Sequence, residues 1–519
     1  MGSHESSVKH GAKVPTRYAL ALFVATACVF ALLGSREPPA GDSRVMYLTG
    51  ESLALRGELS IKWLWPPMSK RGPDGKIYGQ FAPLPPLLAV PTVWVREAIP
   101  STPANAYSLL NITSHLQSHV AAGALALVFF LLCLDLGAAR RRAFLWTAIL
   151  MFATTCAVYA RVVYSEIWQA TFVVMVLREA LRFRADPSMR QTLRLGLAAS
   201  LLVLTKLVYL LSIGPAFLLL LVRATPEVRV RRFPVLVAIL AGAGAVYAGF
   251  NLARWGSLTD TGYGETLGQL GNLPIVGLYG ILFSAGKSIL LFSPPMVLGF
   301  VAAPEFWRRH RDAALLVAAL VVGPMLLAAC LLSWPGDYAW GTRYMVFATP
   351  LFLLPVAIVG EFPRWLTRSL VGFGVVIQLL GASFYFTQYV WLSHVTRAEW
   401  LGEPNRSGSS FKLRDHNTHC GACYEDMHAQ RFLPEFSQLL GHWWLLKSKA
   451  LGRTWDEAQA AAPWSPNTTV TLRRGRTLYD ETRLDWWLLE SPLHIPATLA
   501  ILVLAVLGLW WSARVLRRE

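Results

Sequence analysis

Long apolar runs recur along the whole chain, and this feature limits its fold more than any other. Many of these runs approach the roughly 20 apolar residues that an α-helix needs to cross a bilayer. Hydrophobic residues make up 54% of the 519 residues, and charged residues make up only 15%. Because an ordinary soluble domain has about 25% charged residues, the composition excludes a soluble fold and predicts an all-α polytopic membrane protein.

The positive charge of the chain is concentrated in short arginine clusters between the apolar runs. The net charge of +17 would by itself suggest a nucleic-acid partner. Arginine clusters at the ends of apolar runs have another explanation, because basic loops stay in the cytoplasm and so set the orientation of transmembrane helices. We therefore expect the bilayer, and no nucleic acid, as the partner of this charge. The clusters lie within 140–142, 178–194, 223–232, 308–311 and 514–518.

The apolar runs alternate in direction when every arginine cluster is placed in the cytoplasm. This arrangement predicts about 12 transmembrane helices with both termini cytoplasmic. One run is broken near Lys206, where two short helices would meet on the outside. The expected spans are 18–34, 113–137, 143–160, 167–183, two within 195–222, 234–253, 288–303, 312–333, 345–360, 366–390 and 493–512.

Three long segments then fall outside the membrane, and they define the expected domains. A cytoplasmic tail, 1–17, precedes a transmembrane module over 18–390 with external loops 35–112 and 254–287. Residues 391–492 should form a small external α/β domain, because T468-T-V-T-L-R is strand-like. The last helix and a second cytoplasmic tail occupy 493–519.

The first external loop contains two predicted helices. One runs from Arg44 to Arg56, with Asp42 or Ser43 as its N-cap and Gly57 after its end. The other lies in F81-A-P-L-P-P-L-L-A-V-P-T-V-W-V95, which is apolar but short and broken by prolines. We expect this second helix to lie on the membrane surface, since a span here would reverse the side of every later charge cluster.

Two acids lie at the predicted outer membrane surface. A carboxylate at Asp42, beside a helix N-terminus, stays ionised and could accept a proton from an acceptor hydroxyl as a general base. The alternative is a helix cap without chemistry. Glu166 lies at the outer end of a span, where ionisable groups are candidates for function. The alternative for Glu166 is an ordinary interface residue.

Cationic and phenolic side chains share this outer face. An unpaired lysine in an apolar run is costly, so Lys206 needs an anion unless its side chain reaches the surface. Arginine pairs well with phosphate, although aromatic residues around Arg343 also suit an interfacial belt. These candidate contacts to a substrate or its phosphate are Lys206, Arg254, Tyr263, Lys287 and Arg343.

A C-G-A-C pair, Cys420 and Cys423, lies in the predicted external domain close to several histidines. Three interpretations stay open for this pair. An oxidising exterior favours a disulfide, the neighbouring histidines allow a metal site, and the C-x-x-C spacing allows a redox motif.

Short motifs follow one another on the predicted outer face, namely G41-D-S-R-V-M-Y-L, L53-A-L-R-G-E-L, G75-K-I-Y-G-Q-F-A-P-L-P-P-L-L, Y164-S-E, L204-T-K, N251-L-A-R-W-G-S, F283-S-A-G-K-S-I-L-L-F-S-P294 and G341-T-R-Y344. In this order and on one face, these motifs resemble the GT-C class of integral-membrane glycosyltransferases. Within that class the chain looks like bacterial members related to protein O-mannosyltransferases and to the aminoarabinose transferase of lipid A. The resemblance runs from the first span to about residue 345.

This resemblance implies an inverting transfer of a sugar from a polyprenyl-phosphate carrier, at the external face of a bacterial inner membrane. The catalytic base would be Asp42, and Glu166 would match the acid of the second external loop. Lys206, Lys287 and Arg343 would contact the donor phosphate. The family often has two adjacent acids where this chain has Asp42-Ser43, so no cofactor is firmly implied and the need for a divalent cation stays open.

Two other functions compete with glycosyl transfer. A secondary transporter with about 12 spans would normally have short loops and charged sites near the bilayer midplane. This chain instead has long external segments with its charged candidates beside them. A non-catalytic scaffold with a partner-binding tail is the third hypothesis.

Overall fold

The computed structural model of this chain describes residues 16–64, 68–102, 106–264, 270–336, 338–390, 392, 428–462, 479, 482–486 and 501–508. Most of the described residues are helical. The helices of the first half are α1 (Thr16–Leu32), α2 (Asp42–Arg56), α3 (Leu84–Ala98), α4 (Ala106–Asp135), α5 (Arg140–Phe152), α6 (Cys156–Tyr159), α7 (Glu166–Ala185), α8 (Met189–Thr205), η1 (Leu207–Tyr209), α9 (Leu210–Arg223) and α10 (Pro226–Trp255). The helices of the second half are α12 (Pro274–Phe283), α13 (Ile289–Phe292), α14 (Met296–Arg309), α15 (Arg311–Cys330), η2 (Arg343–Ala348), α16 (Thr349–Ile358), α17 (Arg364–Ser383), α20 (His428–Phe432), η3 (Pro434–Phe436), α21 (Gln438–Ala450) and α22 (Trp455–Ala460).

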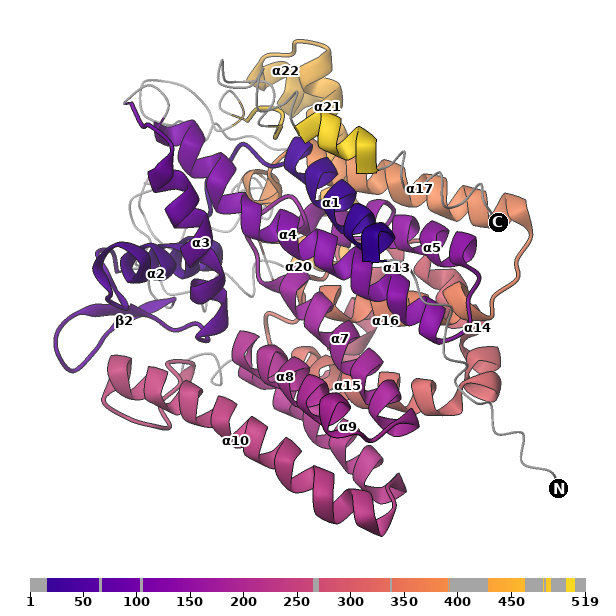
Figure 1. The fold of residues 1–519 in the computed structure, drawn as a ribbon. Coiled ribbons are helices and arrows are strands. Elements are labelled where there is room, and N and C mark those ends of the chain that lie inside the picture. The colour runs from indigo at the N-terminus through magenta and orange to yellow at the C-terminus, as the bar shows by residue number, and fades with distance from the viewer. Residues whose placement is uncertain are drawn as a thin grey trace.

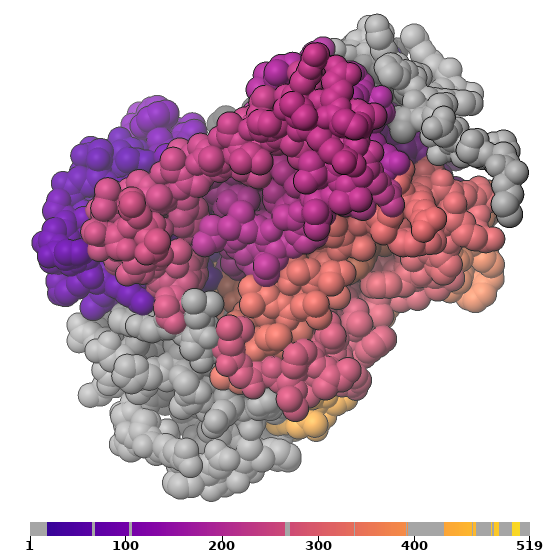
Figure 2. Space-filling view, turned by 90° about the horizontal axis from the view of Figure 1, so that it is seen from below, coloured from indigo at the N-terminus to yellow at the C-terminus, as the bar shows by residue number. Residues whose placement is uncertain are grey.

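Four described helices are long and apolar enough to cross a membrane, namely α4, α10, α15 and α17. Shorter apolar helices cover 18–32, 207–223, 274–283 and 343–358. The described helices therefore fit the predicted all-α membrane protein. The number of about 12 spans stays a prediction. Figures 1 and 2 place α10 at the edge of the helix assembly, and only 22% of its most apolar stretch is buried. An apolar helix that is open to its surroundings suits contact with lipid.

The arginine-bearing ends of several helices gather at one end of the assembly, which we call the basic end. Asp135 at the end of α4 lies 2.9 Å from Arg182 on α7. Asp312 at the start of α15 pairs with Arg184, 2.6 Å away on α7, and with Arg223 at the end of α9. These ion pairs connect α4, α7, α9 and α15 at the ends that the sequence marks as basic.

The opposite ends of the same helices carry the candidate site residues. Helix α7 begins at Glu166, α8 stops just before Lys206, and Arg343 follows the loop after α15. The break predicted at Lys206 is confirmed, because its backbone is extended (φ −165°, ψ 126°) between α8 and η1. The span predicted over 143–160 is instead two helices, α5 and α6. They are separated where the Thr155 amide donates to Ser293 Oγ at 2.9 Å.

Helices α2 and α3, in the first loop that was predicted to be external, pack closely against each other. A Cβ at Gly50 of α2 would lie 2.5 Å from the Pro86 carbonyl oxygen of α3, so only glycine allows this approach. Helix α2 ends at Arg56, and Gly57 follows with φ 67°, as predicted. Figure 1 shows α2, α3 and β2 standing together beside the other helices.

A small antiparallel sheet that was not predicted completes this loop. Its strands are β1 (Ser60–Ile61), β2 (Ser69–Arg71) and β3 (Ile77–Gly79), in the order β1-β3-β2. The register pairs Ser60 with Tyr78 and Lys70 with Tyr78. Strands of two or three residues are too short to show an alternating pattern.

Two other segments that were predicted to be external contain helices. The segment 254–287 includes α12, an apolar helix that packs on α15. Within the predicted external domain, the described residues 428–462 form α20, η3, α21 and α22. The strand-like T468-T-V-T-L-R and both Cys420 and Cys423 lie outside the described residues, so the predicted α/β domain and the cysteine pair stay predictions.

Candidate active site

Asp42 is the first residue of α2, and its carboxylate is not a helix cap. The N-cap position belongs to Gly41, which has φ 54° and no side chain to cap the helix. Our prediction that Asp42 or Ser43 would cap α2 is therefore wrong. Asp42 Oδ2 instead lies 2.9 Å from Nη2 of Arg343 and accepts its hydrogen bond.

Arg343 lies between the two predicted acids. Its Nε is 3.4 Å from Oε1 of Glu166, the first residue of α7, and its Nη2 donates to Asp42. The side chains of Arg343 and Glu166 are only 11% and 7% exposed, whereas that of Asp42 is 25% exposed. One guanidinium thus contacts two carboxylates, and Asp42 is the more exposed of the two acids.

Aromatic rings complete the surroundings of this guanidinium. The Arg343 Cζ lies 5.4 Å from the Tyr164 ring centroid and 5.3 Å from that of Tyr344. Lys206 adjoins the same ring, with its Nζ 4.6 Å from the Tyr344 centroid. Cation–π contacts at these distances are attractive. Tyr344 therefore joins the two predicted phosphate contacts Lys206 and Arg343 into one cluster with Asp42 and Glu166.

Tyr263 belongs to the edge of the same site. Its ring meets Phe81 edge-on, with ring centroids 6.5 Å apart. Burial raises the pKa of Tyr263 well above its usual value, and the nearby Tyr247 hydroxyl and Asp42 carboxylate raise it further. Tyr263 is thus a neutral phenol that can donate a hydrogen bond beside Asp42.

Arg254 and Lys287 have contacts of a different kind. Arg254 is 1% exposed and donates to the carbonyls of Gly79 and Phe81 and to Asn251 Oδ1. It therefore joins the end of α10 to the first external loop. These buried contacts favour a supporting role over the predicted contact with substrate.

Lys287 is fully buried, and its Nζ donates to Ala339 O at 2.6 Å and to Gln438 Oε1 at 3.1 Å. The same Gln438 oxygen accepts from the Gly341 amide at 3.2 Å, and the Thr342 hydroxyl donates to Lys287 O. Lys287 therefore fixes the loop that leads to Arg343. As with Arg254, these contacts favour a supporting role over the predicted contact with phosphate.

Sequence reasoning missed Tyr164, Tyr344 and Gln438. The two tyrosines adjoin predicted site residues, but an aromatic belt at the membrane surface explains such residues equally well. Nothing in the sequence pointed to Gln438 as a site residue, because it lies 95 positions after Arg343 with no motif around it. Within the described ranges, no three His, Cys, Asp or Glu side chains gather as a metal site.

The arrangement suits proton abstraction beside a developing negative charge. Asp42 is a partly exposed carboxylate whose orientation is fixed by Arg343. Among the described residues, Arg343 makes direct contacts with two carboxylates, whereas Lys206 contacts the Tyr344 ring and is attracted to the Glu166 carboxylate over a longer distance. An incoming anion would compete with two directly paired acids for Arg343 but with one more distant acid for Lys206, so Lys206 is the better first contact for a phosphate.

No protein-family model matches the chain, and no curated protein matches it. Among solved structures, the chain is similar to ArnT from Cupriavidus metallidurans, which was crystallised bound to undecaprenyl phosphate. The two share 17% identity over 83% of this chain and 78% of that chain, with a TM-score of 0.47. This is a distant likeness.

Proposed function

We propose that this protein is an integral-membrane, inverting glycosyltransferase that moves a sugar from a polyprenyl-phosphate carrier to an external acceptor. The observation that supports it most is the cluster of Asp42, Glu166 and Arg343, with Lys206 joined to it through Tyr344. It combines a reachable base with two cations that can stabilise a leaving phosphate.

The side of the membrane determines the class of donor. The cluster lies at the helix ends opposite the basic end, where the pairs of Asp135 and Asp312 gather. If the basic end faces the cytoplasm, as arginine-rich loops do, the cluster faces the exterior, where nucleotide sugars are absent. An activated sugar on that face has to arrive on a lipid, and the motif resemblance points to a polyprenyl phosphate.

The proposed reaction is a single displacement. Asp42 accepts the proton of an acceptor hydroxyl or amine as that group attacks the anomeric carbon. The bond from this carbon to the phosphate oxygen breaks, and its electron pair leaves with the polyprenyl phosphate. Lys206 and Arg343 stabilise the charge that develops on this oxygen. Glu166 holds Arg343 in place, and Tyr263 donates a hydrogen bond beside the base.

A reconstitution experiment tests this function. The purified protein is incubated with radiolabelled polyprenyl-phosphate sugars and an extract of bacterial envelope. The proposal predicts that label moves to an envelope lipid, glycan or protein while polyprenyl phosphate is released. Vesicles that accumulate a solute without any transfer would support the secondary transporter instead.

The identity of the sugar and acceptor follows from a second experiment in cells. Mass spectrometry of envelope glycans and lipids would compare a deletion strain with its parent. The proposal predicts one sugar missing from one class of acceptor, and restored by the wild-type gene. An unchanged set of envelope sugars would contradict it.

A further inference from the structure

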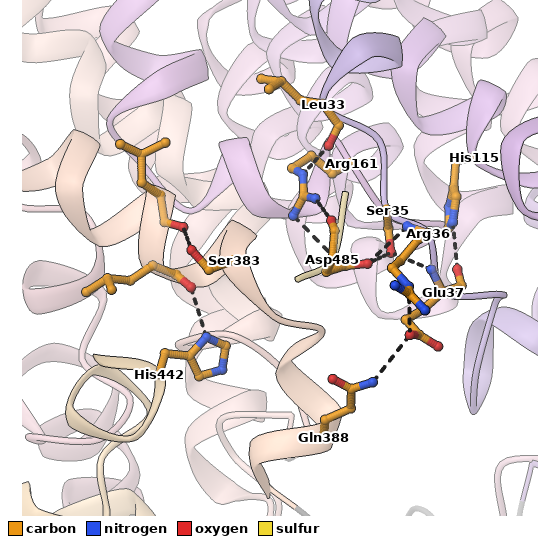
Figure 3. Close-up of polar contacts among 12 residues, drawn as sticks. Leu33, Ser35, Arg36, Glu37, His115, Arg161, Ser383, Gln388, His442 and Asp485 are labelled. Carbon is orange, nitrogen blue, oxygen red and sulfur yellow. Dashed lines mark hydrogen bonds and ion pairs between the residues drawn. The ribbon is translucent and has the colours of Figure 1, made fainter. Parts of the chain in front are cut away.

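A buried ion pair lies next to the candidate site and belongs to none of its predicted residues. Arg161 Nη1 is 3.7 Å from Asp485 Oδ2, and the two side chains are 3% and 2% exposed. The pair joins the segment before α7 to a segment 324 positions later in the chain. Figure 3 shows both side chains and the polar groups around them.

Asp485 holds the segment that leads to Asp42. Its Oδ1 accepts from the Ser35 hydroxyl at 2.6 Å and from the Arg36 amide at 3.0 Å. Its own amide donates to Ser383 O, at the end of α17, at 2.8 Å. Figure 3 shows the contacts from Ser35 and Arg36 meeting at the Asp485 carboxylate.

Arg161 holds the same segment from the other side. Its guanidinium donates to the carbonyl oxygens of Leu33 and Asp485, and its own carbonyl accepts from the Ser35 amide at 3.2 Å. Glu37 extends this network, since its carbonyl meets His115 Nε2 at 2.9 Å.

The segments fixed in this way run directly into the two site acids. Ser35 and Asp42 are connected by R-E-P-P-A-G, in which two consecutive prolines restrict the backbone. Arg161 and Glu166 are connected by V-V-Y-S, with Val162, Val163 and Tyr164 buried. A displacement of the ion pair would therefore be transmitted to both acids through short backbone segments that have little conformational freedom.

We infer that Arg161 and Asp485 are positioning residues for Asp42 and Glu166, so that a segment near the C-terminus sets the geometry of the candidate active site. This inference rests on the proposed function for its catalytic consequence. Neither residue touches the cluster directly. Each acts through the backbone segment that leads to an acid.

The test must separate positioning from stability. Removal of one partner would leave a buried charge unpaired and destabilise the protein, whereas replacement of both by apolar residues is often tolerated. The informative variant is therefore the double substitution Arg161→Met with Asp485→Leu. Its matched control is the triple substitution Arg178→Met, Arg182→Met and Asp135→Leu, which removes both ion pairs of Asp135 between α4 and α7 at the basic end.

We expect the double variant to fold but to melt a few degrees below the wild type, because the Ser35 hydroxyl and the Arg36 amide lose their acceptor. The KM for the polyprenyl-phosphate sugar should stay within about twofold of the wild-type value. The kcat should fall about 10-fold to 100-fold, as expected for a misplaced catalytic group. The control variant should keep the wild-type kcat. Wild-type kcat in a folded Arg161→Met, Asp485→Leu protein would overturn the inference, and so would an equal loss in the control.

Hydrogen exchange provides a readout that needs no activity. In the double variant, peptides that cover 36–47 and 162–170 should exchange faster than in the wild type, while the control should leave them unchanged. If the wild type transfers no sugar, the proposed function fails. If these peptides exchange at the same rate in the double variant and in the wild type, the positioning role fails, whatever the outcome of the transfer assay.

Discussion

Two carboxylates share one arginine at the candidate site, and their exposure separates their roles. Asp42 is 25% exposed and Glu166 is 7% exposed, although both lie against Arg343. A general base has to reach the proton that it removes, so Asp42 fits this role and Glu166 fits that of an anchor for Arg343. The sequence predicted both acids from their places beside spans. Arg343 was predicted as a candidate contact to phosphate, but its pairing with both acids was not predictable, because Arg343 lies 301 positions after Asp42.

Lys206→Ala should weaken the binding of the donor and leave the base in place. The lost ammonium would cost about 1.5–3 kcal/mol of interaction with a phosphate, which corresponds to roughly 10-fold to 100-fold in KM for the donor. Steady-state transfer over a range of donor concentrations measures this effect. Lys76→Ala, on the exposed turn before β3, is the control. Unchanged KM in Lys206→Ala would remove this lysine from the donor site.

The raised pKa of Asp485 predicts that the stability of the protein depends on pH. Burial raises the pKa of its carboxyl above the ordinary value, while Arg161 and the Ser35 hydroxyl act in the opposite direction. The folded state therefore binds this proton more tightly than the unfolded state does. The resulting stability is complete below the unfolded pKa, about 3.9, and is lost as the pH rises through the folded pKa.

Asp485→Asn removes this titration. The melting temperature of the wild type minus that of Asp485→Asn should fall as the pH rises from about 4 to about 7. Thermal unfolding of the detergent-solubilised proteins across this pH range measures the difference. A difference that stays constant or grows with pH would contradict the raised pKa.

At the scale of elements, the close contact between α2 and α3 holds the helix that carries Asp42. Gly50 lets α2 approach the Pro86 carbonyl of α3, and Asp42 begins the same helix. Gly50→Ala would force the helices apart, with a cost of about 1–3 kcal/mol from overpacking. We expect a lower melting temperature and slower transfer.

Gly242→Ala on α10 is the control for Gly50→Ala, because a Cβ at Gly242 meets nothing within 4 Å. This variant should retain the stability and the activity of the wild type. Equal behaviour of the two variants would show that the close approach of α2 and α3 has no consequence.

Elements with a strong local signal were predicted, and those without one were not. Lys206 interrupts an apolar run, and the helix breaks there. The end of α2 at Gly57 also follows from a glycine that takes a positive φ. The break between α5 and α6 lies where the Thr155 amide donates to Ser293 Oγ, 138 positions away, and no local pattern predicts such a contact.

At the scale of the whole molecule, the basic end and the candidate site lie at opposite ends of the same helices. The sequence predicted this separation from charge alone, since Glu166 begins α7 and Arg182 and Arg184 end it. The sequence could not predict that Asp485 pairs with Arg161, because the two residues are 324 positions apart in the chain.

The sidedness can be tested in intact cells. Single cysteines at the exposed positions Lys76 and Arg231, in a chain without other cysteines, would be treated with a membrane-impermeant maleimide. Because Lys76 belongs to the first external loop and Arg231 to the basic end, the cysteine at 76 should react and that at 231 should not. The reverse pattern would place Asp42 in the cytoplasm.

The central claim is that Asp42 is the base of a glycosyl transfer, and a single-turnover assay of Asp42→Asn tests it most directly. Asp260→Asn, an exposed acid of a nearby loop, is the control and should transfer at the wild-type rate. The rate constant with a radiolabelled polyprenyl-phosphate sugar should fall about 10²-fold to 10⁴-fold in Asp42→Asn, the range expected for loss of a general base. A wild-type rate in a folded Asp42→Asn protein would contradict the account.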